Sequence, residues 1–146
     1  MHQNVRGLNT KVNEFYVNVC STDAQVILLT ETWLHSGVSN SEIFPPKFDV
    51  FWSDRRLSRG GGALIAIDSK IIATNLNLLS PVTNIDLIAV KLLCFKKCLT
   101  IVCLYIAPGL AQEHYLCLFE YMESVIDFSQ LVLIVGDFNM PEYIQY

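Results

Sequence analysis

Two carboxylates follow apolar runs that lie far apart in the sequence. Glu31 lies near the end of the segment QVILLTETWL, and Asp137 lies in the segment LVLIVGDFNMP. Each apolar run predicts a strand that is covered on both faces, so each acid would lie at the rim of a sheet. Carboxylate oxygens suit Mg²⁺, which takes one or two of them and completes its coordination with water or substrate phosphate. The pattern indicates a metal and phosphate site, and for Glu31 the alternative is a solvated acid at a strand end.

Amide side chains accompany both acids. Asp137 and Asn139 are two residues apart, so they project from one face if the strand continues through them. Gly136, just before them, allows the backbone to approach a ligand closely. Asn4 ends a third, short candidate strand and would join the same rim, which makes a site of convergent polar groups. The alternative for Asp137 and Asn139 is an Asx-type turn after a buried strand.

Two further features suit phosphate binding. Arg55, Arg56 and Arg59, beside three consecutive glycines, form the one concentrated positive segment. Guanidinium groups suit phosphate recognition, although a solvated loop is the alternative, and the spacing is not that of a P-loop. Tyr105, at the end of LTIVCLY, either hydrogen-bonds a phosphate from a strand end or packs in the core.

The histidines and cysteines give no comparable pattern. No spacing places an imidazole as a general base, so we expect the histidines to be structural or exposed. One close cysteine pair, Cys94 and Cys98, has no second pair and no histidine at ligand spacing, which favours buried reduced thiols over a zinc site. The remaining residues of these types are Cys20, Cys103, Cys117, His2, His35 and His114.

Composition limits the classes of protein. The 146 residues fit one domain, with 52% apolar and 16% charged residues. A net charge of −4 argues against a protein that depends on non-specific nucleic-acid affinity. The most apolar stretch, 87–107, is interrupted by lysines and predicts a hairpin rather than a membrane span. The N-terminus does not resemble a secretory signal, so an intracellular location is expected.

The elements that must position these side chains alternate between strands and helices. One helix would be capped by Asn9 or Thr10 and the second would follow Pro108, while Pro45 and Pro46 mark a loop. In the second helix the apolar stripe comprises Tyr115, Leu118, Phe119, Met122 and Ile126. Strands are predicted at 2–5, 25–33, 48–53, 63–67, 85–93, 99–105 and 131–135. This order favours α/β or α+β layers with helices packed on sheet faces.

Five segments together carry a resemblance. HQNVRGLNTK, LLTETWL, SRGGGALIAI, LYIAP and LIVGDFNMP occur in this order. They resemble the endonuclease/exonuclease/phosphatase superfamily, and most of all the apurinic-type endonuclease domain of non-LTR retrotransposon polyproteins of the insect, jockey-like kind. The resemblance implies an α+β fold, a four-layered αββα sandwich with two sheets packed face to face. It also implies hydrolysis of phosphate esters with Mg²⁺, or Mn²⁺, and DNA as partner, a downstream reverse transcriptase and a nuclear location.

The resemblance also implies roles for single residues. Asn4 and Glu31 would help to hold the metal and its ligands, and Tyr105 would hold the phosphate. Asp137 would orient or activate the attacking water, and Asn139 would bind a phosphate oxygen. The metal would act as a Lewis acid on the phosphoryl group.

The sequence departs from the family pattern in two places. Where the family has a second proline, this chain reads Tyr105-Ile106-Ala107-Pro108. Family members also carry further strands and a late motif that supplies an Asp and the catalytic His, whereas the residues after Asn139 are MPEYIQY. Loss of acid–base help alone costs about 10²–10⁴ in rate. We therefore expect residues 1–146 to form a single incomplete domain, lacking its C-terminal strands and inactive when isolated.

Two other functions stay open at this point. An apolar strand at 131–135 with nothing after it would leave a bare sheet edge, which suits a non-catalytic interaction module. The same superfamily also contains phosphatases and exonucleases that act on lipid, inositol or RNA phosphates, and the sequence lacks the substrate loops that would separate them.

Overall fold

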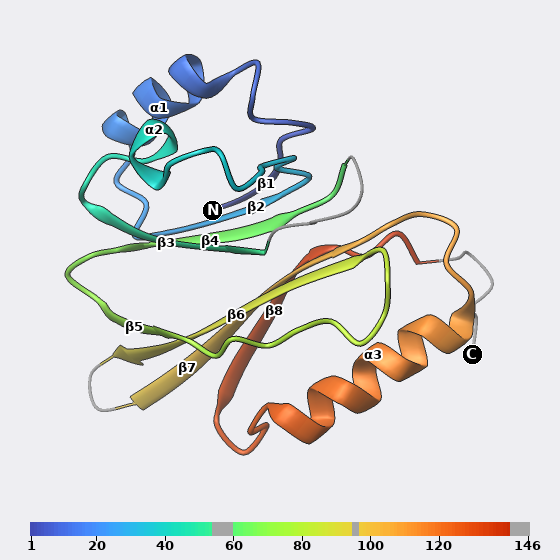
Figure 1. Ribbon diagram of the computed structural model, residues 1–146. Helices are drawn as coiled ribbons and strands as arrows, with labels where there is room; N and C mark the ends of the chain where they lie inside the picture. Colours follow the sequence, from blue (N-terminus) through green and yellow to red (C-terminus); the bar gives the residue numbers. More distant parts are fainter. Residues whose placement is uncertain (54–59, 95–96, 141–146) are drawn as a thin grey trace.

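Four layers make up the chain. A computed structural model describes residues 1–53, 60–94 and 97–140. Figure 1 shows two sheets facing each other, with α1 and α2 over the outer face of one and α3 over the outer face of the other. The predicted α+β sandwich is therefore confirmed as an αββα arrangement.

The first sheet has the strand order β1-β2-β4-β3. β1 runs parallel to β2, and the other neighbours are antiparallel. Apolar side chains of α1 and α2, among them Phe15 and Ile43, pack on its outer face. The elements are β1 (His2–Asn4), α1 (Val12–Ser21), β2 (Val26–Thr30), α2 (Asn40–Ile43), β3 (Phe48–Ser53) and β4 (Ala63–Asp68).

The second sheet has the strand order β5-β6-β7-β8. β6 and β7 form the predicted hairpin, and α3 connects β7 to the parallel strand β8. The α3 residues Tyr115, Leu118 and Met122 are buried against the sheet, as the stripe predicted. The elements are β5 (Ile72–Asn75), β6 (Ile85–Cys94), β7 (Lys97–Ile106), α3 (Gln112–Val125) and β8 (Leu131–Asp137).

Alternate residues of both sheets form the core between them. Leu28 and Ile65 of the first sheet pack with Ile88 and Ile101 of the second. Cys103 lies in the same layer, where its thiol donates to the Leu29 carbonyl at 3.6 Å. Burial raises the pKa of Cys103 to about 12, so the thiol stays protonated. Since alternate residues face this layer, the strand positions that continue it define what meets at the sandwich rim.

Several local predictions were wrong. Neither Asn9 nor Thr10 caps α1, because Lys11 occupies the N-cap position without a side-chain cap. The short elements α2 and β5 were not predicted, and β2 ends at Thr30 rather than continuing to 33. Cys20 and Cys117 are exposed, not buried.

In the described residues no helix is long and apolar enough to cross a bilayer.

The prediction that both apolar runs are covered on both faces holds for β2 but not for β8. Val132 and Ile134 of β8 pack against the α3 side. On the opposite face Leu131 is 59% exposed and Leu133 is 46% exposed. Within the described residues β8 is an edge strand of its sheet. Its outer edge and two leucines are therefore open to a partner.

Close approach of β7 and β8 depends on Gly136. This residue is paired with Leu104 in the parallel ladder. A Cβ at Gly136 would collide with the Leu104 carbonyl oxygen and would also come within 2.7 Å of its carbonyl carbon. Both contacts are backbone atoms, which cannot rotate away, so no larger residue fits without moving a strand.

Gly136→Ala should lower the free energy of unfolding by about 1–3 kcal/mol, the usual cost of overpacking. The control is Gly109→Ala, where φ is +80° but the added methyl meets nothing within 4 Å. It carries only the left-handed backbone penalty, about 1 kcal/mol. Urea denaturation of both variants checks this, and a loss no greater for Gly136→Ala than for Gly109→Ala would contradict the steric argument.

Candidate functional site

One amide joins two carboxylates from opposite sheets. Asn4 Nδ2 donates to Glu31 Oε1 at 3.0 Å and to Asp137 Oδ2 at 2.9 Å. The Asn4 Oδ1 atom accepts the backbone N–H of Arg6 at 3.2 Å. All three side chains are half-buried. The structure thus brings together three residues that the strand-end argument placed at one rim, although 133 positions separate Asn4 from Asp137.

Strand register explains why these side chains meet. Asn4 is paired with Thr30, immediately before Glu31, and Asp137 is paired with Tyr105. Asn4 lies two residues from His2, the partner of the inward-facing Leu28, and Asp137 lies two residues from Val135, which packs in the inter-sheet core. Asn4 and Asp137 therefore continue the inward-facing rows of their strands beyond the last apolar layer.

The backbone at this rim is unusual. Arg6, Glu31, Trp33 and Asn139 all have positive φ, between 41° and 54°. Such conformations cost about 1–3 kcal/mol each and concentrate where function demands them. The Glu31 turn is secured because its carbonyl accepts the Gly7 N–H at 2.7 Å. The turn ends β2 and sets the direction of the Glu31 side chain.

Asn139 and Tyr105 lie beside the cluster but make other contacts. The side-chain amide of Asn139 donates to the Ile106 carbonyl at 2.8 Å, and the backbone carbonyl of Asn139 accepts the Tyr115 hydroxyl at 2.7 Å. Burial raises the pKa of Tyr115, which keeps this hydroxyl a donor. Tyr105 is 8% exposed and, as the register partner of Asp137, emerges on the same face. A phosphate role for Asn139 would require its amide to leave the Ile106 carbonyl.

The remaining candidates lie outside the site or beside it. Arg55, Arg56 and Arg59 fall outside the described residues. His2, expected to be structural or exposed, lies near enough to Asp137 to feel its charge, and its Nε2 is 3.4 Å from Thr30 Oγ1. Burial lowers the pKa of His2, and the attraction of Asp137 offsets part of that effect. The ring is therefore mostly neutral near pH 7.

Two residues at the rim were not singled out from the sequence. Asp86, 4% exposed at the start of β6, accepts the Gly62 N–H at 2.8 Å and so ties the second sheet to the segment before β4. An acid in an otherwise apolar strand was the signal for it. Trp33, two residues after Glu31, is 46% exposed. The sequence did not indicate that Trp33 is exposed, because a tryptophan next to apolar residues is usually part of the hydrophobic core.

The donor set fits a hard divalent cation. Two carboxylates lie within hydrogen-bond distance of a single nitrogen, and like charges held this close are relieved by a cation. Glu31 supplies an oxygen of the kind that Mg²⁺ prefers, water or phosphate would complete the shell, and Asp137 lies where it would act on a water of that shell. Asn4 orients both carboxylates through Nδ2, and it would bind the metal through Oδ1 only after its amide rotates and releases them. Within the described ranges no group of three or more His, Cys, Asp or Glu residues is arranged to hold a metal ion, so water and phosphate would supply most of the ligands.

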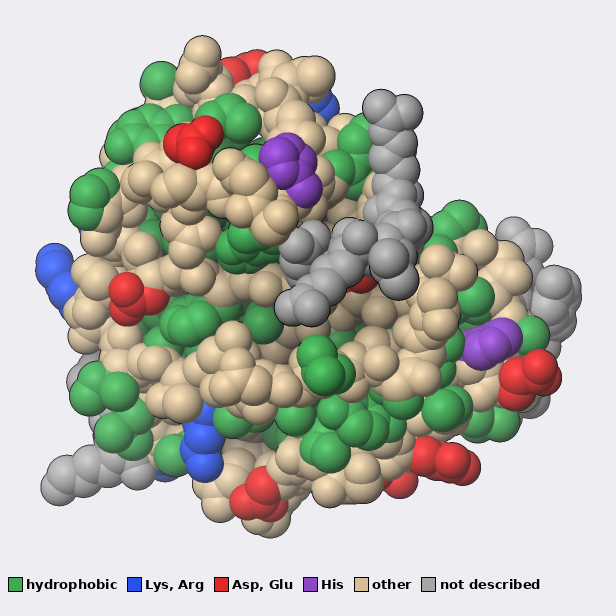
Figure 2. All heavy atoms as spheres, viewed as in Figure 1, with side chains coloured by type: hydrophobic (Ala, Val, Ile, Leu, Met, Phe, Trp, Pro, Cys, Tyr) green, Lys and Arg blue, Asp and Glu red, His purple; other side chains and the backbone are tan. Residues whose placement is uncertain are grey.

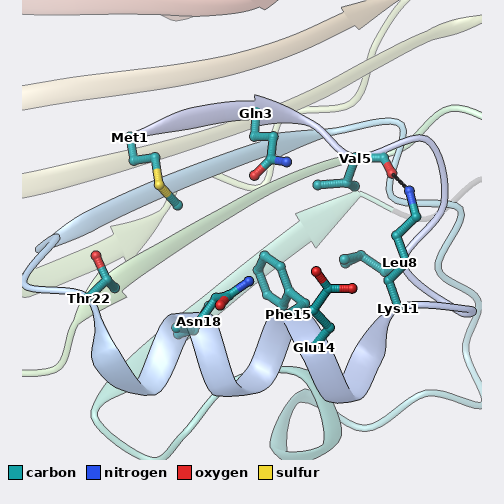
Figure 3. A pocket seen from close by; sticks show the side chains of 10 residues that line it. Met1, Gln3, Val5, Leu8, Lys11, Glu14, Phe15, Asn18 and Thr22 are labelled. Atoms are coloured by element: carbon teal, nitrogen blue, oxygen red, sulfur yellow. Dashed lines mark hydrogen bonds between the residues drawn. The ribbon is translucent and has the colours of Figure 1, made fainter.

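A cavity of about 330 Å³ lies elsewhere, between β1 and α1. Figure 3 shows that Gln3 and Val5 line its strand side, with the Lys11 ammonium directed to the Val5 carbonyl. Gln3 and Val5 alternate with Asn4 along the strand, so the cavity is on the opposite face from the carboxylates. It contains none of the cluster residues. We therefore place the candidate site at the sandwich rim and not in this cavity.

Positive charge does not gather on the visible surface. Figure 2 shows the Lys and Arg side chains of the described residues lying apart from one another on the face in view. The net charge of −4 agrees with this distribution. Phosphate attraction on that face would therefore come from local groups rather than from a broad field.

Comparison with known proteins gives a fold but no family assignment from sequence. No protein-family model matches the chain, and no curated protein matches it. Among solved structures, the endonuclease domain of TRAS1, a telomere-specific non-LTR retrotransposon, is similar at a TM-score of 0.70 and 19% identity over 97% of this chain and 60% of that domain.

Two further structures are similar. An endonuclease/exonuclease/phosphatase family protein from Leptotrichia buccalis has a TM-score of 0.66 at 9% identity, covering 95% of this chain and 65% of that one. D. rerio TDP2 complexed with a single-strand DNA product has a TM-score of 0.65 at 15% identity, covering 97% and 60%. The chain spans about 60% of the TRAS1 domain. It has the endonuclease/exonuclease/phosphatase fold.

Proposed function

We propose that this site belongs to a Mg²⁺-dependent phosphodiesterase that nicks DNA. The observation that carries the proposal is the bridge from the Asn4 amide to Glu31 and Asp137, which gathers two carboxylates at one rim of the sandwich. The shared fold with the TRAS1 endonuclease domain and with TDP2 supports phosphate-ester hydrolysis and a DNA substrate. A jockey-like retrotransposon origin, and with it nuclear action, is part of the proposal.

The chain's own residues would divide the work. Glu31 would bind the cation, which supplies Lewis-acid stabilisation of the phosphoryl oxygens when bound. Asp137 would orient a water and accept its proton, because its carboxylate lies beside Glu31 and opens to the rim. Asn4 would hold both carboxylates in place, and Tyr105 would donate a hydrogen bond to the phosphate. Asn139 would contact a phosphate oxygen once its amide is released.

Removal of either carboxylate should weaken Mg²⁺ binding. Changes outside the ligand shell already cost 10–100-fold in metal affinity, so Glu31→Gln and Asp137→Asn should each cost at least about tenfold. Matched controls are Glu123→Gln and Asp49→Asn, both on exposed residues away from the rim. Isothermal calorimetry with MgCl₂ measures the effect. Equal affinity in the site and control variants would refute the metal assignment.

Activity is proposed for the domain of which these residues form a part. We expect little or no plasmid nicking by the isolated 146-residue chain with Mg²⁺, and robust nicking by a form extended through the downstream reading frame. In the extended form Asp137→Asn should reduce the rate by about 10²–10⁴. Comparison of circular DNA with phosphomonoesters separates an endonuclease from a phosphatase. Robust nicking by the short form would contradict this expectation.

The open edge of β8 favours a second candidate function, a non-catalytic interaction module. Leu131 and Leu133 are exposed on a strand whose outer edge is unpaired within the described residues. Such an edge is a template for pairing with another chain.

If β8 pairs with another chain, light scattering after size exclusion should give a mass above the 16.5 kDa of one chain. Leu131→Lys with Leu133→Lys should restore the monomer, since charges on an edge strand oppose pairing. Leu79→Lys, at a residue 80% exposed away from β8, is the control. A monomeric unmodified chain would count against this function.

A further inference from the structure

Trp33 is a large aromatic side chain held in the open beside the candidate site. It is 46% exposed, whereas its neighbours Thr32 and Leu34 are buried. Only Thr32 stands between it and Glu31, so the Cα atoms of Glu31 and Trp33 lie at most about 7 Å apart. The backbone of Trp33 therefore lies close to the Glu31 end of the candidate site, where a cation would hold a phosphate.

The backbone around Trp33 adopts unfavourable positive φ angles. Both Glu31 and Trp33 have φ of +54°, and Thr32 between them is fully buried. A bulky residue in this conformation is a genuine outlier that persists only where its surroundings over-determine it. A packing role alone would not require this exposure.

The surroundings do fix Trp33 from two segments. Its N–H donates to the Gly61 carbonyl at 3.0 Å, and its carbonyl accepts the Asn9 amide at 3.3 Å. A Cβ at Gly7 would lie 2.6 Å from the ring atom Cε3, so the indole rests directly against the Gly7 backbone. Gly60 also leaves space beside Nε1, where a Cβ would be 3.9 Å away. The ring thus rests against glycine backbone while the residue as a whole stays exposed.

We propose that Trp33 is a stacking platform for an unpaired nucleobase next to the phosphate bound at the carboxylate site. This inference rests on the proposed function and names its substrate class more closely: a nucleic acid strand with an unstacked base at the reacting position. Base–indole stacking tolerates any base, since every base has a π face. Its loss weakens binding by roughly 5- to 150-fold per base.

The second tryptophan serves as an internal control. Trp52 donates its Nε1–H to Asn40 Oδ1 at 2.9 Å and packs with the core cluster under α1 and α2. It therefore lies on the outer face of the first sheet, away from the carboxylates. In a Trp52→Phe background the tryptophan fluorescence, excited at wavelengths beyond the tyrosine absorption, comes from Trp33 alone, because the chain has two tryptophans.

The experiment titrates this single-tryptophan chain with a short oligothymidylate, and with an abasic phosphodiester oligomer of the same length, in the presence of Mg²⁺. We expect quenching by the oligothymidylate and not by the abasic oligomer. In the parent chain, measured by fluorescence anisotropy of labelled oligomers, Trp33→Leu should weaken oligothymidylate binding by roughly 5- to 150-fold. Binding of the abasic oligomer should stay unchanged.

Trp33→Phe keeps an aromatic face over Gly7 and should retain most of the affinity, which separates stacking from a folding defect in Trp33→Leu. Equal quenching by both oligomers, equal affinity of Trp33→Leu and the parent chain for oligothymidylate, or no binding of either oligomer would overturn the stacking role.

Calorimetry with MgCl₂ tests the proposed function separately. Mg²⁺ binding without base-dependent quenching would contradict only the stacking role. Base-dependent quenching without Mg²⁺ binding defeats only the hydrolase.

Discussion

The whole arrangement depends on the alignment of two sheets. Asn4 can share its amide between Glu31 and Asp137 only while β1 and β8 end at the same level on facing sheets. That level is set by apolar side chains between the sheets, which interdigitate at close to crystal density and resist sliding. A displacement of one residue in either strand would turn its rim side chain to the opposite face. The core therefore fixes the chemistry as well as the stability.

Much of the fold could be predicted because burial leaves a clear mark on sequence. The apolar runs of β2, β4, β6 and β7 are covered on both faces, and their strands were predicted to within a few residues. The elements that escaped prediction, α2 and β5, are four residues each, too short for a periodic signal. The cap of α1 was misplaced because Lys11 has no side-chain preference that marks a helix start.

The site was predictable in part for the same reason. An acid that ends an apolar strand lies at a rim, so Glu31 and Asp137 were expected at strand ends, and the register of the two sheets decided that these ends meet. The sequence could not indicate features that depend on positive backbone φ angles or on contacts between the two sheets. The left-handed turn at Glu31 exposes Trp33, and the bond from Asp86 to Gly62 joins residues 24 positions apart. The half-exposed face of β8 also depends on which strands lie opposite it.

The buried thiol of Cys103 can report on separation of the two sheets. It points between the sheets to the Leu29 carbonyl and, with its pKa raised to about 12, holds almost no thiolate at neutral pH. Exposed Cys20 and Cys117 have no such protection. An alkylating reagent would therefore modify Cys20 and Cys117 quickly, would also reach the partly exposed Cys98, and would reach Cys103 only when the two sheets separate. The rate at which Cys103 is labelled therefore measures how often the two sheets separate. The same separation would move Glu31 away from Asp137.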